Sequence, residues 1–450
     1  MAQSIAIWLG VTNGKASPRH EYVAYVVFDV ILGWKYRWYA SYDEWCAVNG
    51  LKLQYGGIDL NDGEGHWIPA AGLLEDDYDG ELEWSDDEGQ GVPGKGRLPF
   101  GVKNANLQRV DADWWSWVFW MITRMEERDA PTNSLDQYGR FQAQHSVIEK
   151  SGWLRRPEVE WRVREWAKSV QAAPTPAAYH VIPTIDVDSA FAYLHRSPWR
   201  RFGATVKDLA KLDWGRLNER RKVLSGQMGD PYDTYSWLEN LHAAHGLRAR
   251  YFFLVSDRGE FDRGIDWKQP GFQRLVAELK RTADVGVHPG FGSFQLELDD
   301  RVAMIKTEKQ RVAQMGNCEV HHARQHYLLQ QYPVSWKVLE QAGILHDHTM
   351  GFADNIGFRA GMSRSFRAYD LESETMLNLT VHPVAVMDAT LKRYLNYTPE
   401  EAVHCVEQLA ESVREVDGVL RLLWHNETVS DRWEWRGWRG VYEQVLERVC

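Results

Sequence analysis

The stretch YHVIPTIDVDS, Tyr179 to Ser189, decides how the larger part of this chain is expected to fold. It is apolar and β-branched, which is typical of a buried strand, and Asp186 and Asp188 stand where the strand ends. Side chains alternate along a strand, so these two carboxylates should face the same way. Two like charges held close indicate a bound cation or acid–base chemistry. The structural alternative is an Asx turn or a helix N-cap, where aspartate is also favoured.

Short apolar runs alternate with helical patterns from residue 180 to the end, and this alternation predicts parallel βαβ units. The predicted strands are residues 180–188, 248–255, 284–289, 319–326, 343–350, 376–386 and 419–424. Seven such units predict an α/β fold in which a seven-stranded parallel (β/α) barrel occupies residues 179–450. An open, doubly wound sheet is less favoured because no glycine-rich nucleotide-binding turn follows any of these strands.

A smaller accessory domain of α+β type is predicted for residues 1–170, and the segment QAAPTPAA, residues 171–178, is predicted to be a linker. Residues 24–32 and 51–60 have strand-like composition. Residues 113–125 are apolar all round yet too short to cross a membrane, which predicts a buried helix, and residues 161–170 predict an amphipathic helix. Residues 57–65 are only loosely similar to a calcium loop, because the alternating ligands and the terminal glutamate are missing.

Composition excludes several classes of function. The chain has 450 residues and a net charge of -11, so it lacks the basic surface that a nucleic-acid partner requires. Much of the negative charge falls in residues 75–88, which we expect to be a solvated loop. The first residues have neither a basic region nor a sustained apolar stretch, so neither a signal peptide nor a membrane span is expected, and the expected location is cytoplasmic. The four scattered cysteines predict reduced thiols.

Polar residues gather at the carboxyl ends of the predicted strands, where parallel barrels carry their chemistry. Asp347 alternates with His346 and His348 along the predicted strand. On a regular strand, either Asp347 or the two histidines can face inward, but not both. The residues at the strand ends are Asp186, Asp188, His288, Arg324, His326, Asp347, His382 and His425.

Four short segments carry a family resemblance. They are PTIDVD, GVHPGFGS at residues 286–293, ARQHY at 323–327 and LLWHN at 422–426, in this order along the chain. Together they resemble the polysaccharide deacetylase superfamily, carbohydrate esterase family four. The chain is more closely similar to a bacterial branch in which the deacetylase barrel follows a separate N-terminal domain. Residues 120–146 and 346–361 also resemble that branch, so the resemblance covers nearly the whole chain.

The resemblance implies metal-assisted hydrolysis of an acetyl group on an N-acetylated sugar, within a polysaccharide or its precursor. The implied cofactor is a divalent metal, with Zn²⁺ expected first and Co²⁺, Ni²⁺ or Fe²⁺ as alternatives. Matched by motif, Asp186 corresponds to the general base and Arg324 to the arginine that orients it. His425 corresponds to the general acid and His288 to the first metal-binding histidine.

Two departures from the family pattern change the expected ligands. Val187 occupies the place of the metal-binding aspartate, so that role moves to Asp188, although the roles of Asp186 and Asp188 are interchangeable at this stage. Gly292 stands where the family has its second metal-binding histidine. The candidates to replace it are His326, His348 and His382. We choose His326, because on a regular strand it shares the face of Arg324.

Further roles and alternative functions follow from the same residues. Arg359 and Asp347 are candidate substrate-binding residues, with fixing of a long loop as the alternative for Arg359. The absence of a histidine at position 292 favours, as an alternative function, a carbohydrate-binding relative that has lost the metal. A glycoside hydrolase that uses Asp186 ranks last, since no second acid stands clearly at a strand end.

Overall fold

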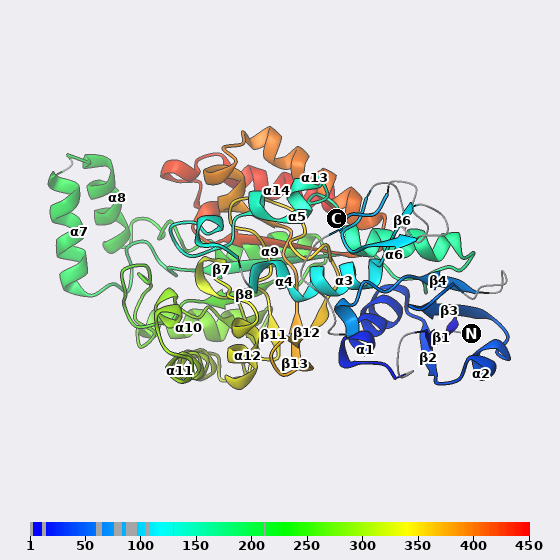
Figure 1. Ribbon diagram of the computed structural model, residues 1–450. Coiled ribbons are helices and arrows are strands. Elements are labelled where there is room, and N and C mark those ends of the chain that lie inside the picture. Colours follow the sequence, from blue (N-terminus) through cyan, green and yellow to red (C-terminus); the bar gives the residue numbers. More distant parts are fainter. Residues whose placement is uncertain are drawn as a thin grey trace.

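The computed structural model describes residues 3–10, 15–59, 65–75, 83–86, 97–104, 109–128, 130–210 and 212–450. The calcium-like segment and the acidic run fall partly outside these ranges, and their predicted loops are not described there. A four-stranded sheet lies in the N-terminal part, and a nine-stranded sheet occupies the rest of the chain. Figure 1 shows the smaller sheet beside the larger one, near the N-terminus.

The N-terminal sheet is parallel and has the strand order β2-β1-β3-β4. Its strands are β1 (Ser4–Leu9), β2 (Lys35–Tyr39), β3 (Leu51–Tyr55) and β4 (His66–Ile68). Helical segments connect β1 to β2 and β2 to β3, while β5 (Gly101–Asn104) and β6 (Arg109–Ala112) form a separate antiparallel pair. The α+β class of this part stays a prediction. The strand predicted at 51–60 is confirmed as far as Tyr55.

The strand predicted at residues 24–32 is wrong, because this segment is helical. Helix α1 (Pro18–Ala24) begins with a capping box between Ser17 and His20 and continues into the π-helix η1 (Tyr25–Leu32). Val26, Val27, Phe28, Ile31 and Leu32 are all buried. An apolar run that is buried on most sides has no clear period, so its composition does not separate a strand from a helix.

Helix α3 (Trp114–Thr123) lies in the core of the N-terminal part and contacts α1 and α4 (Met125–Arg128). Every residue of α3 is buried, as predicted, and Asp113 caps the helix by accepting a hydrogen bond from the Ser116 amide. The helix predicted at 161–170 is confirmed as α6 (Glu158–Ser169). The other elements are α2 (Tyr42–Cys46), β5 (Gly101–Asn104), β6 (Arg109–Ala112), α4 (Met125–Arg128) and α5 (Val147–Lys150).

The nine-stranded sheet has the order β12-β13-β11-β10-β9-β8-β7-β15-β14 and is parallel except at β12. Each of the seven predicted strand segments contains a strand, whereas the antiparallel edge strand β12 was not predicted. The strands are β7 (His180–Val187), β8 (Arg250–Phe253), β9 (Asp284–Val287), β10 (His322–Ala323), β11 (His346–Asp347), β12 (Phe366–Asp370), β13 (Thr375–Val381), β14 (Val386–Met387) and β15 (Val419–His425).

The predicted strand 376–386 is bent, and it links the two ends of the large sheet. After β13, the amides of His382 and Val384 donate to the carbonyls of Asp347 and Met350 on the β11 side, at 2.8 Å each. The Ala385 amide then donates to the Arg421 carbonyl at 3.2 Å, and β14 pairs with β15. Among the described strands no ladder joins β14 to β13 or β12, so a regular closed barrel of seven strands is not confirmed.

Helices flank the large sheet, and a helical hairpin projects from it (Figure 1). The hairpin consists of α7 (Pro198–Ala210) and α8 (Trp214–Leu224). Helix α13 begins with the predicted capping box and proline. The flanking helices are α9 (Tyr235–Ala244), α10 (Pro270–Leu279), α11 (Leu298–Gly316), α12 (Val334–Gln341), α13 (Pro399–Arg414) and α14 (Trp438–Val449). In the described part of the chain, none of the helices is long and apolar enough to cross a membrane.

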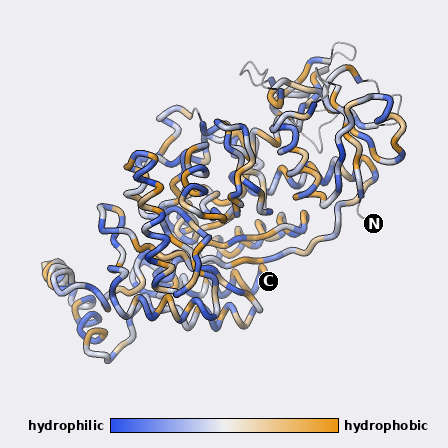
Figure 2. The backbone as a smooth tube through the Cα atoms, turned by 90° about the horizontal axis from the view of Figure 1, so that it is seen from below, coloured by the Kyte–Doolittle hydropathy of each residue, from blue (hydrophilic) through white to orange (hydrophobic). Residues whose placement is uncertain are grey.

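One hydrophobic core extends from the small sheet into the large one. The rings of Tyr22 and Phe119, from the N-terminal part, pack on Tyr369 of β12 with centroids 4.8 and 5.2 Å apart. Figure 2 shows hydrophobic colouring along the strands at the centre of the molecule. The two parts therefore share an apolar interface, and the division at residues 171–178 stays a prediction.

Candidate functional site

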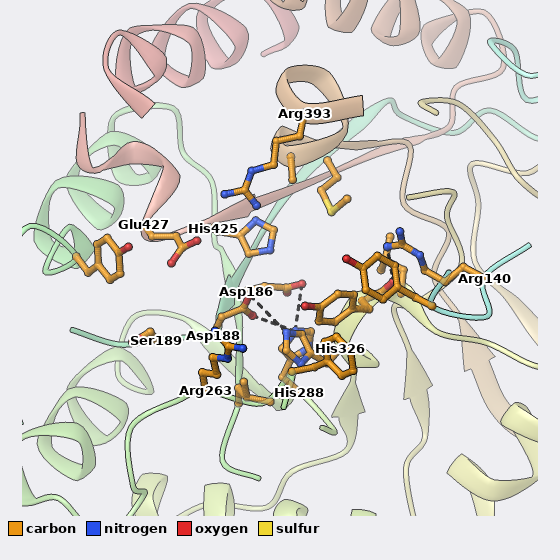
Figure 3. Close-up of a pocket in the computed structure, with 18 of the residues that line it drawn as sticks. Arg140, Asp186, Asp188, Ser189, Arg263, His288, His326, Arg393, His425 and Glu427 are labelled. Carbon is orange, nitrogen blue, oxygen red and sulfur yellow. Dashed lines mark hydrogen bonds and ion pairs between the residues drawn. The ribbon is translucent and has the colours of Figure 1, made fainter. Parts of the chain in front are cut away.

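A pocket of about 530 Å³ opens at the carboxyl ends of β7, β9 and β15. Asp186, Asp188, His288, His326 and His425, which lie in or directly after four separate predicted strand segments, all line it (Figure 3). The predicted positions at the strand ends therefore converge on one cavity, as expected where parallel strands end together.

Asp186 is held by a buried arginine. At the end of β7, its Oδ1 accepts a hydrogen bond from Nη1 of Arg324 at 2.8 Å, and Arg324 is fully buried. Arg324 also donates from Nε to the His348 carbonyl at 2.9 Å, which fixes the guanidinium. The other oxygen of Asp186, Oδ2, lies 3.8 Å from Nε2 of His288. One carboxylate oxygen is thus anchored and the other faces the histidines.

Two histidines turn their Nε2 atoms toward Asp188. His288 Nδ1 lies 2.6 Å from the Arg324 carbonyl, which can only accept, so Nδ1 carries the proton and donates it there. His326 Nδ1 lies 2.8 Å from Oδ1 of Asp262. Their Nε2 atoms lie 3.3 Å and 3.5 Å from the two oxygens of Asp188. Partners of this kind at Nδ1 orient a histidine for metal binding through Nε2.

The three residues fit a divalent cation. One ligand atom from each of Asp188, His288 and His326 lies within 4.8 Å of the others. Oδ1 of Asp188 is buried and has no hydrogen-bond partner among the described residues, although buried oxygens are normally satisfied. It faces Nε2 of His288, whose proton is on the other nitrogen, so two acceptors oppose each other. One carboxylate and two imidazoles suit zinc, cobalt, nickel or ferrous iron.

The charges around Asp188 are strongly coupled. Burial by itself would raise the pKa of Asp188, but the positive charges of His326 and His425 hold it well below its usual value. Burial would likewise lower the pKa of His326, yet the carboxylates of Asp188 and Asp262 raise it to about 9. Without a cation, a proton on His326 thus supplies positive charge beside Asp188. The site is built for positive charge between these groups.

His425 is charged and is oriented by Asp388. Its Nδ1 lies 2.8 Å from Oδ1 of Asp388, and Oδ2 of Asp388 accepts the His425 amide at 2.7 Å and the Thr428 hydroxyl. Burial would lower the pKa of His425, but Asp388 first, then Asp188 and Asp186, raise it to about 10. His425 is therefore an imidazolium near neutral pH, and it borders the pocket (Figure 3).

Asp262 and Asp388 were not predicted from the sequence. Asp262 lies between β8 and α10 and accepts the amides of Phe291 and Gly292, at 2.8 and 3.0 Å, besides Nδ1 of His326. No strand-end position pointed to it. Asp388 follows β14 directly, so it would have stood at a strand end if the predicted strand 376–386 had been drawn two residues longer.

The structure places His326 beside Asp188 and His288, but the shared strand face on which its choice rested is not the reason. Strand β10 already ends at Ala323, so a shared strand face does not explain its position. His326 begins a short 3₁₀ turn (His326–Leu328), and its amide donates to the Pro289 carbonyl at 3.0 Å, which holds it beside His288. Gly292 contributes only its backbone amide, to Asp262.

The structure does not bring Asp347 and Arg359 to the pocket. Asp347 is fully buried and accepts hydrogen bonds from the Thr349 amide at 2.9 Å and from Gln330 at 2.8 Å, on the side of α12. Arg359 forms a buried ion pair with Glu127 of α4. Neither residue lines the pocket, so their predicted substrate-binding role is not supported, and Arg359 instead fixes a loop.

The two remaining candidate ligands belong to a separate histidine cluster. The rings of His348 and His382 stack with centroids 4.3 Å apart, and those of His322 and His346 stack at 4.4 Å. Burial lowers the pKa of all four, that of His322 to about 3. None of them lines the pocket. On the predicted strand 343–350, the side chains of His346 and His348 thus belong to this cluster, and the side chain of Asp347 points away from it.

The N-terminal part of the chain matches a known family model, and solved structures are similar to part of the chain. Residues 9–173 match the model of a family of unknown function, DUF7033. No curated protein matches the chain. One similar solved structure is a protein from Mycobacterium smegmatis provisionally described as a polysaccharide deacetylase. It is 13% identical, has a TM-score of 0.42, and the match covers 62% of this chain and 86% of that one.

Two further structures show a likeness of the same order. A polysaccharide deacetylase from Bacillus cereus is 12% identical, with a TM-score of 0.28 and coverage of 61% of this chain and 87% of that one. The allantoinase PuuE is 8% identical, with a TM-score of 0.36 and coverage of 60% and 83%. Since every TM-score is below 0.5, the function has to be argued from the site itself.

Proposed function

We propose that this chain is a metal-dependent hydrolase that removes an acetyl group from an N-acetylated carbohydrate, like the polysaccharide deacetylases that its motifs resemble. One observation carries the proposal. A carboxylate fixed by Arg324 and a charged imidazole, Asp186 and His425, border the same pocket as the cation-binding triad of Asp188, His288 and His326. Base, acid and metal ligands are the groups that metal-assisted deacetylation requires.

A divalent ion held by the triad would polarise the acetyl carbonyl and lower the pKa of a bound water. Asp186 acts as the general base: Arg324 holds its Oδ1, so its Oδ2 is left to accept the proton of the attacking water. His425 acts as the general acid, because Asp388 keeps it protonated and it can therefore pass a proton to the leaving amine. Asp188 keeps the ligand role and Asp186 the base role, because only Asp188 meets both histidines.

The lining of the pocket supports a carbohydrate substrate. Tyr138, Tyr232, Phe261 and Tyr327 present aromatic rings, and such rings pack against the apolar faces of sugars. Four arginines also line the pocket, and guanidinium groups can donate hydrogen bonds to hydroxyl and carboxylate oxygens; these are Arg140, Arg196, Arg263 and Arg393. From the resemblance of the motifs, we also propose that the large sheet is a deacetylase-type barrel and that residues 1–170 form an accessory domain.

Acetate release from N-acetylated oligosaccharides tests the activity. We expect turnover that a chelator abolishes and that zinc or cobalt restores, with about one ion bound per chain. Asp186→Asn should lose at least about 100-fold in kcat. Asp299→Asn, at an exposed position in the first turn of α11, is the matched control and should be unchanged.

Two outcomes would contradict the proposal. Turnover that persists in the chelator and in Asp186→Asn would exclude this mechanism. Failure to bind any divalent ion, combined with retained affinity for saccharides, would instead identify a non-catalytic carbohydrate-binding protein. The reason for that alternative was the missing histidine at position 292, and His326 supplies a nitrogen in its place.

A further inference from the structure

The projecting hairpin of α7 and α8 has polar contacts between its helices. Arg220 of α8 donates to Oδ2 of Asp208 at 2.5 Å and to Oγ1 of Thr205 at 3.0 Å, both on α7. Arg220 and Asp208 are 8% and 5% exposed, although charged side chains are seldom so buried. The inner side of the hairpin is thus held by an ion pair.

The apolar side of the hairpin faces outward instead. Trp199, Phe202, Val206 and Leu209 follow one another at helical spacing on α7, and they are 84%, 67%, 48% and 45% exposed. Leu212 and Trp214, at the turn between the two helices, are 70% and 65% exposed. A helix of a soluble protein normally turns such a stripe to the core, so an exposed one indicates an interaction surface. We call these six residues the apolar stripe.

The hairpin is basic in an otherwise acidic chain. Residues 198–224 contain eight lysines and arginines against three aspartates and glutamates, whereas the whole chain has a net charge of -11. One of the three acidic residues, Asp208, is already paired with Arg220. Arg216, Arg221 and Lys222 of α8 are exposed. Exposed tryptophan and phenylalanine together with surrounding basic residues are typical of helices that lie in a membrane interface.

We propose that the hairpin docks on an anionic lipid surface, with the apolar stripe inserted at the level of the headgroups. Charge complementarity selects this occupant: anionic headgroups attract the basic residues, and acyl chains accept the tryptophans and phenylalanine. Symmetric pairing of the hairpins of two copies would place like charges together, which is repulsive. A nucleic acid would leave the apolar stripe in water. This inference does not depend on the proposed function.

The hairpin begins next to the pocket that holds the metal-ligand candidates. Arg196, two residues before α7, lines the pocket that holds the metal-ligand candidates. It also lines an adjoining pocket of about 530 Å³, together with Trp199 of the apolar stripe and Asp262. Figures 1 and 2 both show the hairpin extending away from the body of the molecule. Because Arg196 and Trp199 line the adjoining pocket together, a docked hairpin would turn this side of the molecule toward the lipid surface.

Flotation of the full-length chain with vesicles tests the proposal. We expect the chain to float with vesicles that contain phosphatidylglycerol, at least about tenfold more than with phosphatidylcholine alone, and to be released by high salt. The triple variant Trp199→Ser, Phe202→Ser and Trp214→Ser should lose at least about tenfold in partitioning. Ile58→Ser, which changes a 76% exposed residue of the N-terminal part, is the matched control and should float like the unaltered chain.

The result is interpretable because the altered residues are exposed. Circular dichroism and the melting temperature should be the same for the triple variant and the control, and a second variant, Arg221→Ser with Lys222→Ser, tests the charge alone. It should reduce the preference for anionic vesicles. The proposal is overturned if the chain does not float with either vesicle, if the triple variant floats undiminished, or if sedimentation shows a dimer without lipid that the triple variant abolishes.

Discussion

Replacing Asp388 by asparagine should shift the pH dependence of the proposed reaction. Asp388 accepts a hydrogen bond from Nδ1 of His425 at 2.8 Å. Burial lowers the pKa of His425, and Asp388 is the first of the groups that raise it to about 10. Asparagine can still accept this hydrogen bond but carries no charge. Only Asp188 and Asp186 then oppose the lowering by burial, so the pKa of His425 should fall toward its usual value of about 6.5.

The size of the effect follows from the fraction of His425 that is protonated. At pH 8 a group with a pKa of about 10 is almost wholly protonated, whereas one with a pKa of about 6.5 is protonated to roughly 3%. The general acid would then be nearly absent, so kcat/KM of Asp388→Asn should fall by at least about 30-fold at pH 8. At pH 5.5 both proteins keep the proton, and the loss should shrink to a few-fold.

The assay is the profile of kcat/KM against pH from 5 to 10 with the metal ion in excess. The basic limb of Asp388→Asn should move to lower pH, while the profile of the exposed control Asp299→Asn keeps its position. A bound cation repels the imidazolium and lowers the pKa of His425 in every protein, but it preserves the difference between them. Basic limbs that superimpose would refute the role of His425 as acid or the control of its charge by Asp388.

Three further predictions follow. Burial raises the pKa of Glu308 to about 8. The protonated carboxyl therefore contributes its full stability below about pH 4.5, and this contribution is lost as the pH rises through 8. By scanning fluorimetry, Glu308→Gln should raise the melting temperature by several degrees at pH 8.5 but not at pH 4.5. Asp262→Ala should weaken zinc affinity about 10- to 100-fold, measured against a competing chelator, since it frees Nδ1 of His326. Arg359→Met should destabilise the fold by about 3 kcal/mol, because it removes one partner of buried Glu127. The melting temperature should fall while KM stays unchanged. Equal melting temperatures would contradict the buried ion pair.

The strand ends of the large sheet could be predicted because they depend on local pattern. Alternating and apolar runs placed a strand in each of seven segments, and the rule that parallel strands end at one edge brought Asp186, His288 and His425 together. The same local pattern was ambiguous at residues 24–32. There the run is apolar on nearly every side, and only packing made it a helix.

The partners that set the chemistry could not be predicted, because they meet only in three dimensions. Asp262 reaches His326 across 64 positions of sequence, and Glu127 reaches Arg359 across 232. Neither pairing has a periodicity that a single sequence reveals.

The sequence by itself determined the alternation of strands and helices, the carboxylate and histidine side chains at the strand ends, and the net negative charge of the chain. The tertiary structure decided which histidine completes the triad, which aspartates orient His326 and His425, and that Arg359 is bound elsewhere. The physical reason is the separation along the chain over which each interaction acts. Side-chain period and caps act between near neighbours along the chain, whereas protonation and ligand geometry depend on charges only a few ångströms apart that the fold brings together.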